Sequence, residues 1–448
     1  MRTAVELLKY LITLKCVNDP ENNIKPSKQC VEGIKEILLD KKLDPDHIED
    51  EGYHSFIYTL GSGKPIILMT AHFDVVPPGP SWTRDPFLGI EENGRIYGRG
   101  AIDDLSNVAV MIYISREIER IASRLGGTII VAFTGDEETG GAHGAGKLRE
   151  YLMTKNLFPS YMINGDGGGL VVINRRRTSF RIEISIESKR RLVHGIKMNK
   201  RYILESKYRH AAYFTPGSDV HPLIKLAQEI DSEDYYVSKI SGAFVKSNVL
   251  PEYVEAEVVK ETDESKEVHE VDKNLTKLIK TLLPLTRILI MPEYPSMYGV
   301  TATPNVYRFS GDKHIIEIDV RAPVKKEGYK NLREYISMIL EEYLPEASYT
   351  IHSGVGYLDT PKSSRIVKKA IKVLKELRLK PEVVERAGAS DSRYFSPFGV
   401  EAIDFGPVGG NAHGPDEYVE IWSLEPLAKF YKKLVQELLT PDEKGFSE

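Results

Sequence analysis

The feature that most constrains this chain is a series of short apolar runs, each breaking into a glycine-rich loop that carries a histidine or a carboxylate. Four of these loops fall between residues 64 and 169 and a fifth lies far downstream: TAHFDVVPPG (70–79), GRGAIDD (98–104), AFTGDEETGG (132–141), INGDGGG (163–169) and GGNAHGPDEY (409–418). The apolar runs are typical of buried parallel strands, and amphipathic helical patterns separate them. This alternation predicts an α/β fold with a mostly parallel central sheet flanked by helices.

In such a sheet the carboxyl ends of parallel strands meet at one edge, and ligands bind beyond that edge. His72, Glu137, Glu138 and Asp166 each follow the end of a predicted strand, and His413 lies in a loop after another. The sequence therefore predicts that these side chains gather at a single edge of the sheet.

The pattern changes at about Arg175. FRIEISIES (180–188) and HIIEIDVRA (314–322) alternate between apolar and polar residues, as half-exposed antiparallel strands do. The α/β pattern resumes near Gly354 with two helical segments and a strand between them. We therefore expect an α/β domain in two parts, residues 1–174 and 354–448, interrupted by an α+β domain over residues 175–353.

Composition limits the partners. The 448 residues carry a formal net charge of −5, too small to favour nucleic acid or an anionic membrane as a partner. The basic stretch 189–201 and the acidic stretch 255–272 are better explained as solvated hairpins than as binding sites. The helical N-terminus is too polar for a signal peptide or a membrane span, and Cys16 and Cys30 are too few for a disulfide framework, so we expect a cytoplasmic protein.

Imidazole nitrogen and carboxylate oxygen are ligands that zinc accepts. His72 is followed two residues later by Asp74, which on a strand end points the same way and can hold the second ring nitrogen. Alone, this pair is more often structural. Asp103 and Asp104 follow a tight turn, where aspartate also caps helices; we assign Asp103 to a metal and leave Asp104 as a helix cap or a support for the metal ligands.

Glu137 and Glu138 are adjacent acids that would repel each other if unpaired. A metal can bind one while the other acts as a base toward metal-bound water, although an exposed acidic turn explains the pair alone equally well. Asp166 and His413, taken singly, would be ordinary turn residues. Five candidate ligands at one edge of one sheet favour a site for two metal ions.

These motifs resemble those of the dinuclear-zinc aminoacylase/carboxypeptidase family, which includes acetylornithine deacetylase, succinyl-diaminopimelate desuccinylase, glutamate carboxypeptidase, tripeptidase and carnosinase-type dipeptidases. The resemblance covers nearly the whole chain and implies a cis peptide bond after the bridging aspartate. It implies two Zn²⁺ ions, with Co²⁺ or Mn²⁺ as alternatives. The resemblance implies that one ion binds His72 and Asp166, that the other binds Glu138 and His413, and that Asp103 bridges the two ions. Glu137 would be the general base, and Asp74 would orient His72.

By the same resemblance the inserted domain is a lid that also dimerises, so we expect a homodimer. His210 would stabilise the developing oxyanion, although Arg209 stands where the family usually has glycine. The implied substrate-binding residues are Asn305, Arg321, Ser390, Asp391 and Arg393. The chain departs from the family at Leu105, where lysine is common, and in a longer lid.

The implied activity is hydrolysis of an amide bond in a small N-acyl amino acid or a short peptide. Asp166, where many deacylases have glutamate, tilts the expectation toward a peptidase. The alternative is a non-catalytic protein of the same fold that binds an amino-acid derivative or a protein partner; an intact Glu137 argues against it. A nucleotide-binding or redox enzyme is excluded because GDGGG and GRGA lack the spacing of a phosphate-binding fingerprint.

Overall fold

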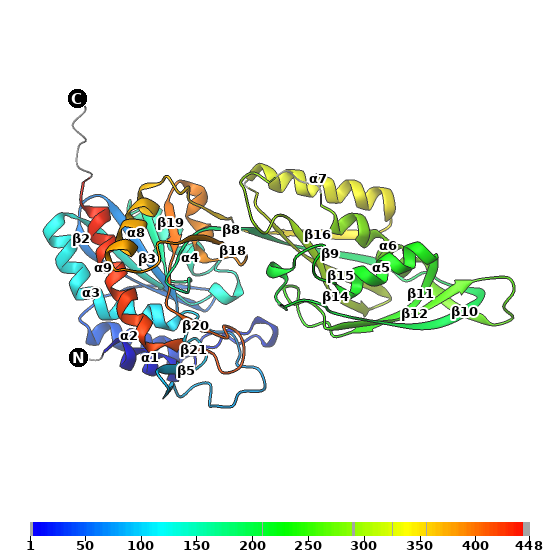
Figure 1. The fold of residues 1–448 in the computed structure, drawn as a ribbon, viewed down its shortest axis with the longest axis horizontal. Helices are drawn as coiled ribbons and strands as arrows, with labels where there is room; N and C mark the ends of the chain where they lie inside the picture. The colour runs from blue at the N-terminus through cyan, green and yellow to red at the C-terminus, as the bar shows by residue number, and fades with distance from the viewer. Residues whose placement is uncertain (1–2, 208, 289–291, 325, 355, 442–448) are drawn as a thin grey trace, which may run out of the picture. The chain divides into compact units, whose positions relative to one another are not determined.

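The computed structural model describes residues 3–207, 209–288, 292–324, 326–354 and 356–441. The chain divides into two compact units, which are treated separately below (Figure 1). Unit 1 comprises Met1–Arg176, Leu358–Arg386 and Ser390–Glu448, and unit 2 comprises Arg177–Tyr357 and Ala387–Ala389. The chain passes between the units after Arg176 and after Tyr357, and no sequence pattern had indicated that Ala387–Ala389 would group with unit 2.

Unit 1 is built on one large mixed sheet with the strand order β1-β2-β6-β3-β7-β19-β8-β17, and with β18 beside β8. The strands are β1 Asp46–Asp50, β2 Tyr53–Ser62, β3 Ile66–His72, β6 Gly127–Thr134, β7 Tyr161–Asn164, β8 Val172–Arg176, β17 Leu358–Asp359, β18 Val383–Arg386 and β19 Glu401–Asp404. The central strands β6, β3, β7 and β19 run parallel, as predicted. Antiparallel pairs flank them on both sides, and β18 pairs in parallel with β8 beyond them, so the sheet is mixed.

Helices cover both faces of this sheet, which is why β3 is apolar at nearly every position. Ile67 and Met69 join a core with α1, α2, α3, α8 and α9, whereas Ile66 and Leu68 join a second core with α4. The alternation follows from the strand, where successive side chains point to opposite faces. The helices are α1 Ala4–Thr13, α2 Lys28–Asp40, α3 Leu105–Leu125, α4 Ala145–Thr154, α8 Arg365–Glu376 and α9 Leu424–Leu439.

Helix α3 begins at Leu105, so Asp104 occupies its N-terminal cap position. The Asp104 side chain is engaged elsewhere and does not cap the helix. The helix ends at Gly126, whose φ of 78° lies in the region that glycine adopts without steric cost. The start of α3 thus fixes the two aspartates of the GRGAIDD loop at the edge of the sheet.

A small second sheet in unit 1 joins segments more than 300 residues apart. Its strand order is β20-β21-β5-β4, with β4 Ile90–Glu92, β5 Arg95–Tyr97, β20 Gly409–Gly410 and β21 Tyr418–Glu420. The antiparallel pairing of β5 with β21 places Tyr97 opposite Tyr418. This pairing brings the loop that contains His413 beside the loop that contains Asp103.

Cys16 and Cys30 form a disulfide, with their Cα atoms 5.2 Å apart. The cysteine count predicted no disulfide framework, but the two cysteines suffice for this one bridge. It ties the segment after α1 to the first turn of α2. Within the described residues, no helix combines the length and apolar character needed to cross a membrane.

Unit 2 contains an antiparallel sheet with the order β14-β15-β9-β16. Alternate residues of β9, from Phe180 to Ile186, lie in a core shared with α5, α6 and α7, so helices back one face of the sheet. The elements are β9 Thr178–Glu187, β14 Thr301–Ser310, β15 Lys313–Ala322, β16 Ser348–Ser353, α5 Pro222–Glu233, α6 Lys273–Thr286 and α7 Lys326–Tyr343.

The remaining strands of unit 2 close into a four-stranded barrel, which the sequence did not predict. They are β10 Arg190–Ile203, β11 Tyr235–Gly242, β12 Tyr253–Glu261 and β13 Val268–Asp272. The basic stretch lies on β10 and part of the acidic stretch on its neighbour β12. Arg201 forms an ion pair with Glu255 at 3.0 Å, and Arg191 with Glu261 at 2.8 Å. The two charge runs therefore neutralise each other across a strand pair.

Candidate metal centre

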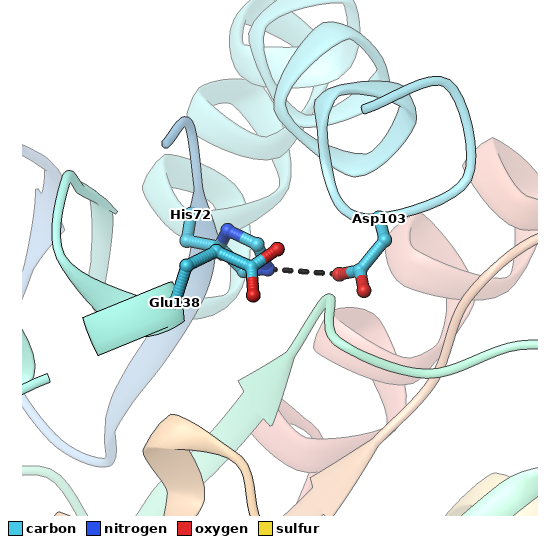
Figure 2. Close-up of side chains that lie close together, drawn as sticks. All are labelled: His72, Asp103 and Glu138. Carbon is cyan, nitrogen blue, oxygen red and sulfur yellow. Dashed lines mark hydrogen bonds and ion pairs between the residues drawn. The ribbon is translucent and has the colours of Figure 1, made fainter. Parts of the chain in front are cut away.

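Five loops of unit 1 bring the predicted ligands to the carboxyl edge of its sheet. His72 is the last residue of β3, and Glu138 lies in the short 3-10 helix η2 (Glu137–Thr139) that follows β6. Asp103 precedes α3, and His413 lies between β20 and β21. Figure 2 shows His72, Asp103 and Glu138 pointing toward one another.

Asp103 lies between the two histidines. Its Oδ1 is 3.0 Å from Nε2 of His72, and its Oδ2 is 3.1 Å from Nε2 of His413. The same His413 nitrogen is 3.0 Å from Oε1 of Glu138. One ligand atom from each of His72, Asp103 and Glu138 lies within 4.8 Å of the others. A carboxylate that presents one oxygen to each of two imidazoles is arranged as a bridging ligand must be.

The donor set suits a divalent cation. Imidazole nitrogens and carboxylate oxygens are its only members, and both are zinc ligands. Asp166 follows β7 and lies outside the tight group, with Oδ1 at 3.3 Å from Nη2 of Arg176. Burial raises the pKa of Asp166 well above its ordinary value, and the acids Glu137 and Asp103 add to this effect while Arg176 opposes it. A cation bound among these acids would relieve their repulsion.

Asp74 does more than orient His72. The Nδ1 atom of His72 lies 3.0 Å from the backbone oxygen of Asp74 and 3.4 Å from its carboxylate. That carboxylate also accepts the backbone N–H groups of Glu137 and Glu138, each at 3.1 Å, and the side-chain amide of Asn18 at 2.8 Å. Asp74 thus joins the loop after β3 to the turn after β6, and Asn18, which no motif identified, holds Asp74.

Asp104 supports the same strand end. The peptide bond between Asp103 and Asp104 is cis, as the resemblance implied. The Asp104 carboxylate accepts the backbone N–H of His72 at 3.2 Å and the side-chain amide of Asn107 at 2.6 Å. Asp103 is therefore directed to the ligand group, while its neighbour Asp104 holds the backbone of His72.

Glu137 lies beside the ligands with a mostly buried carboxyl group. Burial raises its pKa to about 7, although Arg393, whose Nη2 is 3.8 Å from Oε1 of Glu137, opposes the shift. A carboxyl group with a pKa near neutrality can both accept and return a proton. Arg393 also donates to the backbone oxygen of Gly140 at 2.7 Å, so its guanidinium is fixed against the η2 turn.

Ser390 and Asp391 lie in unit 1 near the η2 turn, and each side chain forms a hydrogen bond to another residue of unit 1. The Ser390 hydroxyl donates to Asp404 at 2.8 Å, and Asp391 accepts the hydroxyl of Thr134 at 3.1 Å. The other Asp391 oxygen is buried and has no hydrogen-bond partner among the described residues. Of the three residues predicted in this segment, Arg393 is the one in contact with Glu137.

The other predicted residues belong to unit 2. Asn305 is fully buried; its amide nitrogen donates to the backbone oxygen of Ser247 at 2.6 Å and to the Thr303 hydroxyl at 3.0 Å. Its Oδ1 lies 3.1 Å from Nε2 of His221. The amide of Asn305 is thus used to join three segments of unit 2.

Arg321 and His210 are also bonded inside unit 2. Arg321 forms a two-pronged ion pair with Asp319, at 2.7 and 2.8 Å. The Nδ1 atom of His210 accepts the backbone N–H of Ala212 at 3.0 Å, which caps the short helix η3 (Ala211–Tyr213). The structure therefore brings four of the predicted ligands of unit 1 together, His72, Asp103, Glu138 and His413, and places the predicted residues of unit 2 among local partners.

A family profile agrees with this site: the profile described as peptidase family M20/M25/M40 matches residues 68–437. The chain belongs to this family, and it is a metal-dependent hydrolase of amide or peptide bonds.

Similar curated proteins include the succinyl-diaminopimelate desuccinylases of Nautilia profundicola, 24% identical over 97% of this chain and 99% of the relative, and of Wolinella succinogenes, 25% identical over 95% and 97%. Among solved structures, the aminoacylhistidine dipeptidase of Vibrio alginolyticus matches with a TM-score of 0.69 at 14% identity, covering 96% of both chains. An M20 family metallo-carboxypeptidase of Sulfolobus solfataricus matches with a TM-score of 0.65 at 17% identity, covering 98% of this chain and 100% of its own. At these identities the solved structures show a shared fold.

Proposed function

We propose that this chain holds two zinc ions and hydrolyses the amide bond of a small substrate that carries a carboxylate, either an N-acyl amino acid or a short peptide. The observation that carries the proposal is the position of Asp103, with one carboxylate oxygen toward His72 and the other toward His413. A bridging carboxylate is the part that a two-metal site needs and a one-metal site does not. Asp166 completes the ligands on the His72 side and Glu138 those on the His413 side.

Bound zinc would lower the pKa of water and polarise the scissile carbonyl group. The chain's own residues do the rest. Glu137 removes the proton from the attacking water and later returns it to the leaving amine, a role that suits its position next to the proposed ligand Glu138. Asp74 keeps Glu137 in place by accepting the N–H groups of the turn.

For substrate binding we propose Arg393 as the group that attracts the substrate carboxylate, since its Nη2 lies 3.8 Å from Oε1 of Glu137. Ser390 and Asp391 would shape the same side of the site. Unit 2 would act as the lid and dimerisation domain of a homodimer, with His210 at the oxyanion and Asn305 and Arg321 on the substrate. The names of the similar desuccinylases and dipeptidases support both substrate classes.

The test is a panel of acetyl, succinyl and peptide substrates offered to the zinc-loaded protein and to its Glu137→Gln variant. We expect turnover on at least one substrate class and a fall of about 10²- to 10⁴-fold in the variant, the usual contribution of a general base. The variant should keep the wild-type number of bound metal ions. Glu150→Gln, which alters an exposed glutamate paired with Lys147 on α4, is the matched control and should keep full activity. Equal turnover by Glu137→Gln and wild type would exclude Glu137 as the base.

A further inference from the structure

A buried ion pair lies behind the candidate metal centre. Arg99, in the GRGAIDD loop, and Glu417, in the GGNAHGPDEY loop, form an ion pair in which each side chain is 1% exposed. A charged pair this deep is costly to desolvate unless hydrogen bonds satisfy its remaining atoms. The question is therefore which groups the pair holds.

Glu417 holds the loop of the bridging aspartate. Its Oε1 accepts the backbone N–H of Ile102 at 3.1 Å and that of Asp103 at 3.2 Å, while its Oε2 accepts from Arg99. The backbone of Asp103 is thus anchored by a side chain from a segment more than 300 residues away.

Arg99 holds two further loops. Its Nη2 donates to the backbone oxygen of His413 at 3.3 Å, and to those of Pro77 and Pro78 at 3.3 and 3.1 Å. Pro77 and Pro78 belong to the loop that follows His72. One guanidinium and one carboxylate therefore connect the loops of His72, Asp103 and His413.

The backbone of His413 shows why this anchor is needed. Its φ is 62°, in the left-handed region that residues other than glycine seldom adopt. Such a conformation persists where surrounding contacts fix it. The bond from Arg99 to the His413 carbonyl is one such contact.

We propose that Arg99 and Glu417 are positioning residues whose ion pair sets the spacing between Asp103 and His413, and thereby the affinity for the second metal ion. The inference rests on the proposed dinuclear function. Neither residue is a ligand. Their effect passes through the backbone of the two ligands, and it falls mainly on the ion held by His413, because Arg99 bonds that residue directly.

The test is a titration of the metal-free full chain with Co²⁺, followed by visible absorption and by elemental analysis of bound metal. The variants are Arg99→Lys, which keeps the charge but loses the planar fork, Glu417→Gln, which keeps the shape, and the double variant. His413→Ala is the reference for loss of the second ion. Glu437→Gln is the matched control, because Glu437 forms ion pairs with Lys369 and Lys372 between α8 and α9 and touches none of the three loops.

We expect both single variants to bind the second Co²⁺ 10- to 100-fold more weakly, the usual effect of groups that orient ligands, and the first within about 3-fold of wild type. The double variant should bind no more weakly than the weaker single variant, since the pair acts as one unit. The Glu437→Gln control should bind the first and the second Co²⁺ with wild-type affinity. Any loss of thermal stability in this variant should come only from its two lost ion pairs.

Wild-type affinity for both ions in Arg99→Lys and Glu417→Gln would overturn the inference, as would an equal loss of both ions. If one single variant does not fold, the other decides. A wild-type chain that binds fewer than two ions would contradict the dinuclear proposal itself, and this result appears before any variant is compared.

Discussion

The predicted site residues have different kinds of contact partner in the two units. In unit 1 the predicted ligands meet one another: His72 and His413 both lie about 3 Å from Asp103. In unit 2 the predicted substrate residues meet structural partners, as Arg321 does with Asp319. The unit 1 set was chosen from residue type and position after predicted strands, whereas the unit 2 set was chosen only by resemblance to short motifs.

The contrast separates two uses of a buried polar group. Crowded acids and imidazoles without neutral partners are costly to bury, so their presence in unit 1 indicates a cation. A buried amide whose hydrogen bonds are all made within the protein, such as Asn305, has an adequate structural explanation. The following experiments test whether this division between the units is real, from the largest expected effect to the smallest.

Metal removal should distinguish the units most clearly. A chelator should abolish turnover, by at least about 10³-fold, and should destabilise unit 1 alone. A ligand present at about 1,000 times its dissociation constant stabilises its site by about 4 kcal/mol. We expect hydrogen–deuterium exchange to accelerate in β3 and β6 of metal-free protein and to stay unchanged in β9 and β15. Equal acceleration of exchange in both units would show that metal binding does not stabilise unit 1 more than unit 2.

The acid stability of unit 2 should depend on His221, the partner of Asn305. Burial lowers the pKa of His221 to about 4 from an ordinary 6.5, with the hydrogen bond to Asn305 opposing the shift. Above pH 6.5 the ring is neutral in both states and the full stability is present. Between pH 6.5 and 4 only the unfolded chain takes up the proton, so the free energy of unfolding falls by about 3 kcal/mol across this window.

His221→Gln removes this titration while keeping groups that can bond Asn305. Urea unfolding at pH 7, 6, 5 and 4 should show a shallower decline for the variant than for wild type, by about 3 kcal/mol over the range. Parallel declines would show that His221 is protonated in the folded protein, and would remove the structural explanation of Asn305.

In unit 1, Asp74→Asn should lower turnover by about 10- to 100-fold, as changes to groups that support metal ligands do. The asparagine can accept only one of the two N–H groups from the η2 turn, so Glu137 and Glu138 lose part of their anchor. Asp359→Asn, which alters an aspartate bonded to Arg175 in the same unit, is the control for steady-state kinetics. Unchanged turnover in Asp74→Asn would show that the turn holds its position unaided.

The sequence predicted the parts of this fold that depend on local pattern. Fully apolar runs such as β3 indicated buried strands, and alternation in β9 indicated a half-exposed one. It did not predict the barrel, because a half-exposed strand such as β10 has the same pattern in an open hairpin and in a closed barrel. Closure depends on which distant strands pair, and periodicity does not encode that.

The site shows the same limit. The candidate metal ligands could be predicted from residue type and from position after a strand, as His72 and Glu138 were. Residues that act through the backbone of others did not, as Asn18 shows. Arg99 and Glu417 carried a weak signal, since each is a charged residue inside a glycine-rich motif, but only the structure showed that they face each other.

The smallest effect concerns the charge runs of the barrel. Arg201 and Glu255 are 58% and 43% exposed and lie 3.0 Å apart. Exposed pairs of this kind contribute about 0.2–1 kcal/mol, because water and salt screen them. A double-mutant cycle with Arg201→Ser and Glu255→Ser should therefore give a coupling within that range, and raised salt should reduce it. A coupling above about 2 kcal/mol would mean that the pair is shielded from water in solution, as it would be at an interface between two copies of unit 2. That outcome would indicate that this face of the barrel takes part in an interface between two copies of unit 2. The functional residues of unit 2 would then lie on its surface, and buried residues such as Asn305 would have a structural role.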